Sequence, residues 1–486
     1  MRYDRSQRPY HMHPVALRRD AAIDHAAHYF DSGAFRTDLA RRIAYRTESQ
    51  EPSQAPALRA YLSEEIAPQI AQFGFVSTIV EDPRGAHGPM LIAERREDDA
   101  LPTILAYGHG DVVRGYDDQW RAPLGPWSVT VDGERWYGRG SADNKGQHSI
   151  LLGGLASAVA AREGRLGYNV KLLLETGEEI GSPGLHDVCR LRRAELSADA
   201  LIASDGPRLA ADRPTVFLGS RGCVNFTLSL RLREGGHHSG NWGGLLANPA
   251  TMLAHALSSM IGPRGTLEVD GLRSPPLPDA VRSALAGIAV GGDAGDPDID
   301  EDWGEPGLSP AERVFGANTL EVLAFQAGNP DHPVNAIPPC ATAHCQLRFV
   351  VGTDWEHLED HVRRHLAARG HEKMEVNVVQ ASPATRLSPD DPWVRFAVES
   401  LGRTTGKPIA VLPNLGGTLP NDAFADILGL PTIWIPHSYP GCSQHAPNEH
   451  LLGRLAREGL MMMAGLFWDL GDGEAVRLRA GRRVSS

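Results

Sequence analysis

The chain has 486 residues, of which 42% are hydrophobic and 22% charged, and its formal net charge is −12. This length predicts roughly two or three domains, and the acidic balance argues against nucleic acid or an anionic membrane as a partner, since both need a basic face. No apolar run approaches the roughly 18 residues of a membrane span, and five cysteines, an odd number, do not describe a disulfide framework.

The first part of the chain alternates between helical and strand patterns. Residues 1–20 contain no apolar stretch, so we expect no secretory signal and a cytoplasmic location. Apolar residues at three- and four-residue steps predict helix over residues 37–74. The next expected strands are residues 76–81, 90–94, 170–174 and 200–204. Residues 104–113 are an apolar run that breaks into a polar turn flanked by glycine, and residues 142–160 open with polar residues and become a long helix of small residues. Strands that alternate with helices predict an α/β domain with a largely parallel sheet.

The pattern changes after residue 213, and we assign residues 214–384 to an inserted α+β domain. Its expected elements are amphipathic strands within 215–233, 341–351 and 375–380, helices at 249–261 and 355–369, and a loop at 291–310 that is rich in Gly, Asp and Pro. The α/β pattern then returns, with helices at 393–402, 421–428 and 450–470 and strands at 409–412 and 432–435. Residues 1–213 and 385–486 therefore form two parts of one α/β domain.

Acidic and imidazole side chains follow the predicted strands of the α/β domain. In chain order they are His109, Asp111, Asp143, Glu178, Glu179, Asp205 and His445. Ligand sites of open α/β sheets lie beyond the carboxyl ends of the strands, and imidazole with carboxylates suits zinc, with manganese or cobalt as substitutes. Taken singly, each has a structural explanation, such as a helix cap or an acidic pair at a helix start. We favour a metal site because all these groups fall at the same end of one domain.

Seven segments carry a resemblance to a known family. They are YGHGDVV, YGRGSADNKGQ, LLETGEEIGSPG, SDGP, GGHHSGNWGG, NAIPP and CSQHAPNEH. In order and approximate spacing they resemble the signature blocks of the two-zinc metallopeptidases that include aminoacylase, carnosinase and cytosolic dipeptidase, glutamate carboxypeptidase and succinyl-diaminopimelate desuccinylase. The resemblance implies a zinc-peptidase-like catalytic domain with a mostly parallel central sheet, and an inserted ferredoxin-like domain that acts as lid and dimerisation unit.

Carried over residue by residue, the resemblance implies two zinc ions per subunit, with Mn²⁺ or Co²⁺ as substitutes. His109 and Asp205 would be terminal ligands of one ion. Glu179 and His445 would be terminal ligands of the other ion, and Asp143 would bridge the two. A departure is that asparagine follows Asp143 where many relatives carry a second aspartate, but that residue is not expected to be a ligand.

The resemblance also implies roles for residues beside the ions. The two ions would lower the pKa of a water that lies between them. Glu178 would be the general base or acid beside this water. Asp111 would hydrogen-bond the second nitrogen of His109 and so fix its tautomer. His445 is preferred to His450 as the ligand, because we expect His450 to start the last helix.

The inserted domain contributes further candidates. His238 precedes Ser-Gly in the glycine-rich segment, and it resembles a family histidine that reaches into the partner subunit's site; without the motif, His238 and His237 are equally ordinary loop residues. Arg348 lies on an alternating strand and is a candidate for bidentate binding of a substrate carboxylate, or an ordinary exposed arginine. Three further candidates resemble substrate contacts of the family: Asn335, Gly417 and Thr418.

We therefore expect a cytosolic, homodimeric two-zinc hydrolase that cleaves the amide bond of a dipeptide or short peptide with a free carboxylate. The extra length around residues 262–329 resembles the dipeptidase branch. The nearest alternative is a deacylase of acetyl, succinyl or similar N-acyl amino acids. A remote alternative is a non-catalytic binding protein on the same fold, against which the presence of Glu178 and of all five candidate ligands argues.

Overall fold

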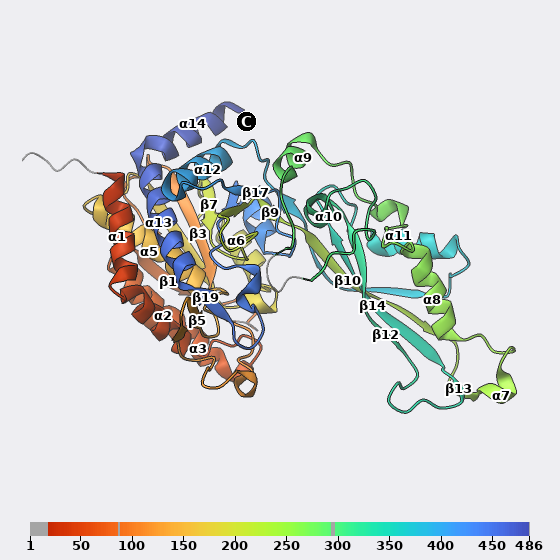
Figure 1. The fold of residues 1–486 in the computed structure, drawn as a ribbon. Coiled ribbons are helices and arrows are strands. Elements are labelled where there is room, and N and C mark those ends of the chain that lie inside the picture. Colours follow the sequence, from red (N-terminus) through yellow and green to blue (C-terminus); the bar gives the residue numbers. More distant parts are fainter. Residues whose placement is uncertain (1–17, 86–87, 293–296, 486) are drawn as a thin grey trace, which may run out of the picture.

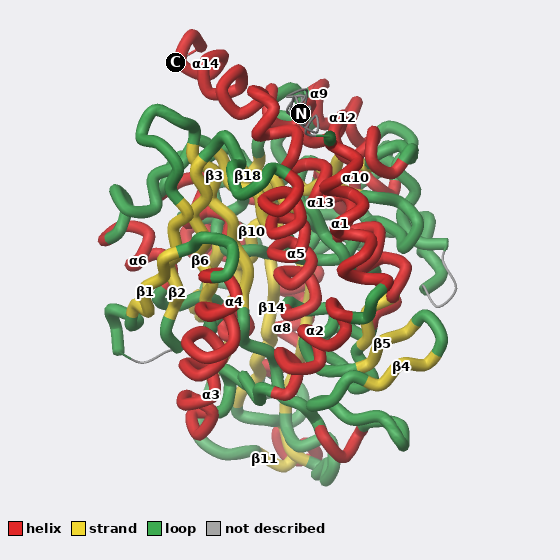
Figure 2. Tube along the Cα trace, turned by 90° about the vertical axis from the view of Figure 1, so that its left-hand side faces the viewer, coloured by secondary structure: helices red, strands yellow, loops and turns green. Residues whose placement is uncertain are grey.

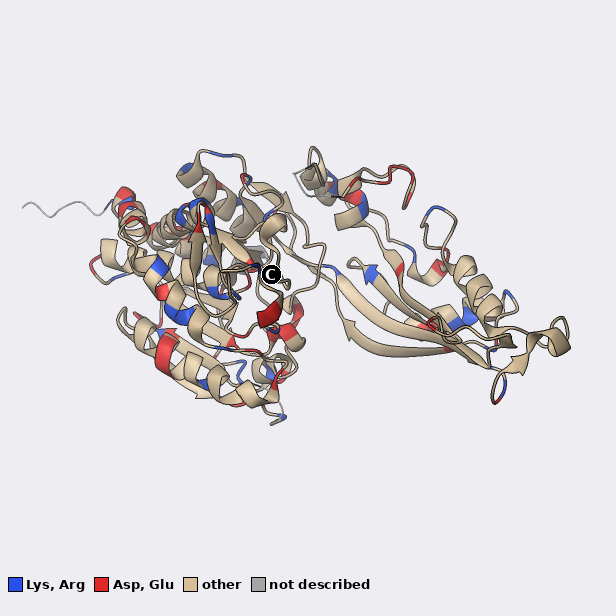
Figure 3. Ribbon diagram, turned by 60° about the horizontal axis from the view of Figure 1, so that its bottom comes forward, with Lys and Arg blue, Asp and Glu red and all other residues tan. Residues whose placement is uncertain are grey.

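The computed structural model describes residues 18–85, 88–292 and 297–485, which fold into two units joined by a narrow connection (Figure 1). The chain start, where we expected no signal, and part of the predicted 291–310 loop lie outside the described residues. Among the helices described, none is long and apolar enough to cross a membrane. Acidic and basic residues are interspersed along both units (Figure 3).

The larger unit is built on an eight-stranded sheet in the order β1-β2-β6-β3-β7-β18-β8-β17. The strands are β1 (Val76–Val80), β2 (Met90–Arg95), β3 (Thr103–His109), β6 (Asn169–Glu175), β7 (Ala200–Ala203), β8 (Thr215–Phe217), β17 (Ala410–Leu412) and β18 (Thr432–Trp434). The run β6-β3-β7-β18 is parallel, as is the pair β8-β17. The pairs β1-β2, β2-β6 and β8-β18 are antiparallel, so the expected parallel sheet is flanked on both sides by strands that run the other way. The connection between β1 and β2 is too short for the crossover that a parallel pair needs.

Helices cover both faces of this sheet. The first face carries α1 (Arg19–Asp31), α2 (Ala34–Ala44), α5 (Lys145–Ala161), α12 (Pro392–Thr405) and α13 (Gly453–Asp469), of which α1, α2, α5 and α13 stand together in Figure 2. The opposite face packs against α6 (Leu185–Leu191), α9 (Asp279–Leu285), α10 (Pro310–Gly316) and η6 (Ala423–Ile427). Along β3, Ile104 and Ala106 join the first core while Leu105 and Tyr107 join the second. A strand buried on both faces explains the continuous apolar run at this position.

Two predicted helices differ from the structure. The helical pattern at residues 37–74 is interrupted after α2, and α3 (Ala55–Ala60), η2 (Tyr61–Ile66) and α4 (Ala67–Ala71) follow a nonhelical stretch. That stretch is held by tertiary contacts, because Thr47 accepts a hydrogen bond from the Val112 amide. The predicted helix at 450–470 is wrong at its start. Its first three residues form β19 (His450–Leu452), which pairs with β5 (Arg135–Tyr137) beside β4 (Thr130–Asp132), and α14 (Ala475–Ser485) ends the chain.

The smaller unit has the expected α+β architecture. Its antiparallel sheet has the order β12-β14-β10-β15, formed by β10 (Gly222–Arg231), β12 (Thr319–Ala327), β14 (Cys340–Phe349) and β15 (Glu375–Ser382). Helices α8 (Pro249–Met260) and α11 (Leu358–Ala367) cover the apolar face of the sheet. The farthest end of this unit carries β11 (His237–His238), α7 (Ser239–Trp242) and β13 (Ala336–Ile337). Strand β12, which was not predicted, has mostly exposed residues and no alternating pattern.

Some segments that the sequence assigned to the smaller unit lie in the larger unit. We expected borders at 213/214 and 384/385, but β8 belongs to the larger sheet, and the chain crosses through β9 (Gly219–Ser220) paired with β16 (Thr385–Arg386). The first crossing therefore lies a few residues after 213/214, whereas the second lies at 385–386. Helices α9 and α10, inside the predicted insertion, return to the larger unit, where Leu285 and Phe315 pack in its second core.

Candidate metal centre

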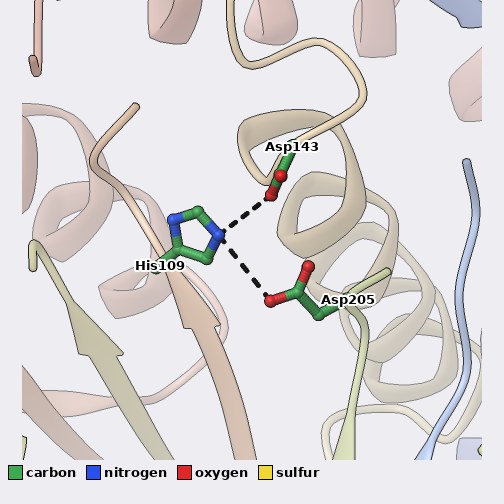
Figure 4. A group of neighbouring side chains, drawn as sticks. All are labelled: His109, Asp143 and Asp205. Atoms are coloured by element: carbon green, nitrogen blue, oxygen red, sulfur yellow. Dashed lines mark hydrogen bonds and ion pairs between the residues drawn. The ribbon is translucent and has the colours of Figure 1, made fainter. Parts of the chain in front are cut away.

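Three buried side chains meet at the carboxyl ends of the parallel strands (Figure 4). His109 ends β3, Asp143 lies just before α5, and Asp205 follows β7. His109 Nε2 lies 3.0 Å from Asp143 Oδ1 and 3.7 Å from Asp205 Oδ2. One potential ligand atom of each residue lies within 4.8 Å of the other two, so this group could hold a metal ion.

A second group shares Asp143 with the first. His445 Nε2 lies 3.0 Å from Asp143 Oδ2 and also 3.0 Å from Glu179 Oε2. These three residues form the other group whose ligand atoms all lie within 4.8 Å of one another among the described residues. The five candidate ligands thus lie together as two trios joined by one carboxylate, the arrangement that a pair of bridged ions requires.

Asp111 organises the residues around the first group. His109 Nδ1 lies 3.1 Å from the Asp111 carbonyl oxygen and 3.3 Å from its Oδ1, on the ring edge away from Asp143. The Asp111 carboxylate also accepts the backbone N–H groups of Glu178 and Glu179, at 3.3 and 3.1 Å. One buried side chain therefore orients the imidazole and fixes the turn that carries both glutamates.

Burial and crowding control the charges of this centre. Burial, together with the Asp143 charge, raises the pKa of Glu179 to about 7 and that of Asp205 to about 6. Hydrogen bonds to Asp143 and Glu179 raise the pKa of His445 to about 11. Burial also raises the pKa of Glu178. The negative charges of these buried carboxylates therefore repel one another, and a positive ion between them would relieve the repulsion.

The donor atoms of this centre fit divalent metal ions. Two of its buried carboxylate oxygens, Asp205 Oδ2 and Glu179 Oε1, have no hydrogen-bond partner among the described residues. An unpaired buried carboxylate oxygen is costly, and metal coordination is one of the ways proteins satisfy it. Two imidazole nitrogens and three carboxylates are a ligand set that suits zinc or a similar ion.

Two supporting residues were not predicted. Buried Glu449 accepts the backbone N–H groups of Ala142 and Asp143, at 2.9 and 3.0 Å, and thereby fixes the loop before α5. Gln444 donates a hydrogen bond to Asp143 Oδ2. Both lie within the segment CSQHAPNEH, but nothing in their spacing distinguished them from loop residues.

The candidate substrate-binding residues and His238 fall into separate places. Arg348 and Thr418 line a cavity of about 470 Å³ that also contains Glu178, and the Arg348 guanidinium donates to Thr418 Oγ1 at 2.7 Å. Gly417 borders a neighbouring cavity of about 360 Å³. His238 and Asn335 are exposed at the far end of the smaller unit, where the Ser239 amide donates to the Asn335 carbonyl. Within one chain they do not join the metal centre.

The chain resembles known proteins along most of its length. The family described as Peptidase family M20/M25/M40 matches residues 105–468. The human protein named Beta-Ala-His dipeptidase is 32% identical over 409 residues, 79% of this chain and 77% of that protein. Among solved structures, the Sulfolobus solfataricus M20 family metallo-carboxypeptidase Sso-CP2 superposes with a TM-score of 0.74 at 23% identity, covering 89% of this chain and 98% of that one. Human carnosine dipeptidase 1 superposes with a TM-score of 0.73 at 22% identity, covering 93% of this chain and 99% of that one. The two structures share the fold described above.

Proposed function

The chain belongs to the peptidase family M20/M25/M40, and from this premise we propose that it is a dipeptidase that depends on two divalent metal ions. The observation that carries the proposal is the pair of trios joined by Asp143. The relative named Beta-Ala-His dipeptidase supports a dipeptide as the substrate. The five cysteines are unpaired, which fits a reducing compartment and the cytoplasm as the proposed location.

We assign the metal ligands as the two trios suggest. His109 and Asp205 hold one ion, and Glu179 and His445 hold the other, with Asp143 between them. When bound, the ions would provide Lewis-acid chemistry, by which an amide carbonyl is polarised and a water becomes nucleophilic near neutral pH. Zinc is the proposed metal, with manganese or cobalt as substitutes.

Glu178 is the proposed acid–base residue. It lies on the same turn as Glu179 but belongs to neither trio, and it lines the cavity. From there its carboxylate takes a proton from the attacking water and delivers it to the leaving nitrogen. The turn, held by Asp111, restricts Glu178 to this position.

Arg348 is the proposed site for the free carboxylate of the substrate. Among the described residues its guanidinium contacts Gln346 and Thr418 but no carboxylate. Arg221 lies nearby and also has no carboxylate partner in the described part of the chain; burial and the Arg348 charge lower its pKa to about 10. Two guanidinium groups that form no ion pair among the described residues favour an anionic ligand.

We expect metal-free protein to bind two Zn²⁺ ions per chain, with an affinity that falls in acid because the ligands must be deprotonated. Asp205→Asn or Glu179→Gln should each weaken one site, whereas Asp143→Asn should weaken both. Elemental analysis and calorimetric titration measure these stoichiometries. Finding no more than trace metal in fully active protein would refute the assignment.

A substrate comparison tests the proposed reaction. The zinc-loaded protein is expected to hydrolyse Ala-Leu, and to lose most of its activity on Ala-Leu-amide, which lacks the carboxylate that Arg348 binds. N-Acetyl-leucine and N-succinyl-leucine measure the alternative deacylase activity. Faster turnover of the N-acyl compounds than of the dipeptide would favour the deacylase.

The smaller unit is the proposed homodimer interface. Strand β12 lies at the edge of its sheet and exposes Val322, Leu323 and Phe325, by 40, 59 and 45%. An exposed apolar edge strand is prone to uncontrolled association unless another strand covers it. A second copy of the same strand, related by a twofold axis, would cover it in a closed assembly.

A further inference from the structure

The cavity beside Glu178 has two chemically different walls. The wall from the smaller unit is the polar face of its sheet and contains Asn225, Gln346 and Arg348. The opposite wall comes from the larger unit and contains His186 and Asp422. A substrate whose carboxylate lies on Arg348 would therefore face His186 across the cavity.

His186 and Asp422 form a tight pair in this wall. His186 Nε2 lies 2.6 Å from Asp422 Oδ2, and the imidazole is more exposed than the carboxylate, at 29% against 12% of the side chain. Both side chains line the cavity, and His186 is the more exposed of the two. The other ring nitrogen, Nδ1, has no hydrogen-bond partner among the residues that the structure describes.

The surroundings of this imidazole favour its protonated form. The hydrogen bond to Asp422 raises the pKa of His186 against the opposing effect of burial. Glu175 also raises this pKa, and Arg190 lowers it. Arg84, which lines the same cavity, is neutralised by Asp187 at 2.6 Å. The favoured imidazolium form, which carries an N–H on both ring nitrogens, therefore lines the cavity.

We propose that His186, oriented by Asp422, is a subsite for an acidic side chain on the C-terminal residue of the substrate. This inference rests on the proposed dipeptidase function and narrows its substrate class. Arg348 would bind the main-chain carboxylate, and His186 Nδ1–H would donate to the side-chain carboxylate. The lining also contains hydroxyl and amide side chains, among them Ser182, Asn225 and Gln380, which can solvate a polar side chain of the substrate.

Three dipeptides that differ only in the last side chain test the subsite: Ala-Glu, Ala-Gln and Ala-Leu. We expect the wild-type protein to prefer Ala-Glu in kcat/KM. His186→Gln removes the charge and should lower the ratio of Ala-Glu to Ala-Leu by about 10- to 100-fold, the usual value of a hydrogen bond to a charged group. The loss should fall mainly on KM, because the contact is made equally in the ground and transition states.

Two further variants separate recognition from a structural effect. Asp422→Asn should lower the same ratio by a smaller factor, because the imidazole remains but loses its orienting charge. His357→Gln is the matched control, since His357 pairs with Asp354 at 2.7 Å on an exposed surface of the smaller unit, and it should leave the ratio unchanged. Equal losses on all three dipeptides, or a wild-type protein that does not prefer Ala-Glu, would overturn the proposal.

Binding of free amino acids tests the subsite independently of turnover. The wild-type protein should bind L-glutamate more tightly than L-leucine by about 10-fold or more, and His186→Gln should abolish that difference. Equal binding of the two amino acids would overturn the subsite. Failure to hydrolyse any dipeptide would instead count against the proposed function, and the binding result would still decide the role of His186.

Discussion

Glu178→Gln is expected to lower kcat by about 10²–10⁴-fold, the range that a positioned acid–base group supplies. Glutamine has nearly the shape of glutamate but cannot accept the proton. Because Glu178 belongs to neither trio of candidate ligands, the variant should retain both ions. Single-turnover kinetics measure the rate, and elemental analysis of the same preparation measures the metal.

The neighbouring glutamate provides the matched comparison. Glu179 lies 3.0 Å from His445 in the second trio, so Glu179→Gln should lose one ion as well as activity. Both side chains occupy the same turn and the substitution is the same, so a general effect on folding would act on both variants alike. If Glu178→Gln remained nearly fully active while Glu179→Gln kept its metal, the division of roles within the pair would be wrong.

The proximity of the candidate ligands could be predicted because it follows from the sheet. His109 ends β3 and Asp205 comes soon after β7, and because these strands are parallel neighbours, the two side chains emerge at one edge. Glu178 and Glu179 follow β6, the other parallel neighbour of β3. His445 depended on the resemblance, because it lies in a loop and has a φ of 60°, a left-handed conformation that no local pattern indicated.

The rest of the site depends on contacts between distant segments. Glu449 reaches the loop of Asp143 across 306 residues, and His186 meets Asp422 across 236. Neither pair has a periodicity or a spacing that sequence reasoning can detect. The late crossing between the units has a similar cause, since β8 is assigned to the larger unit only by pairing with β17 and β18.

His238→Ala is expected to lower kcat by about 10²–10³-fold, the usual cost of removing a donor to an oxygen that becomes negative in the transition state. His238 is exposed at the far end of the smaller unit, near β13 and α7 in Figure 1, and so it does not reach the metal centre of its own chain. In a homodimer joined through the smaller units, that end of one subunit can meet the larger unit of the other. The variant should keep its metal, and His237→Ala, a change at the adjacent residue, should have a much smaller effect.

Mixed dimers decide whether His238 acts across the interface. Glu178→Gln and His238→Ala are each expected to be nearly inactive alone. If the site is shared, a dimer with one subunit of each kind contains one site with both defects and one site with neither. Activity should then return to about half that of wild type per mixed dimer, whose formation affinity tags on the two chains verify. If His238 acted within its own chain, every site in a mixed dimer would carry one defect, and activity would not return. That result would reject the role of His238 across the interface. The assignment of the metal ligands would be unaffected.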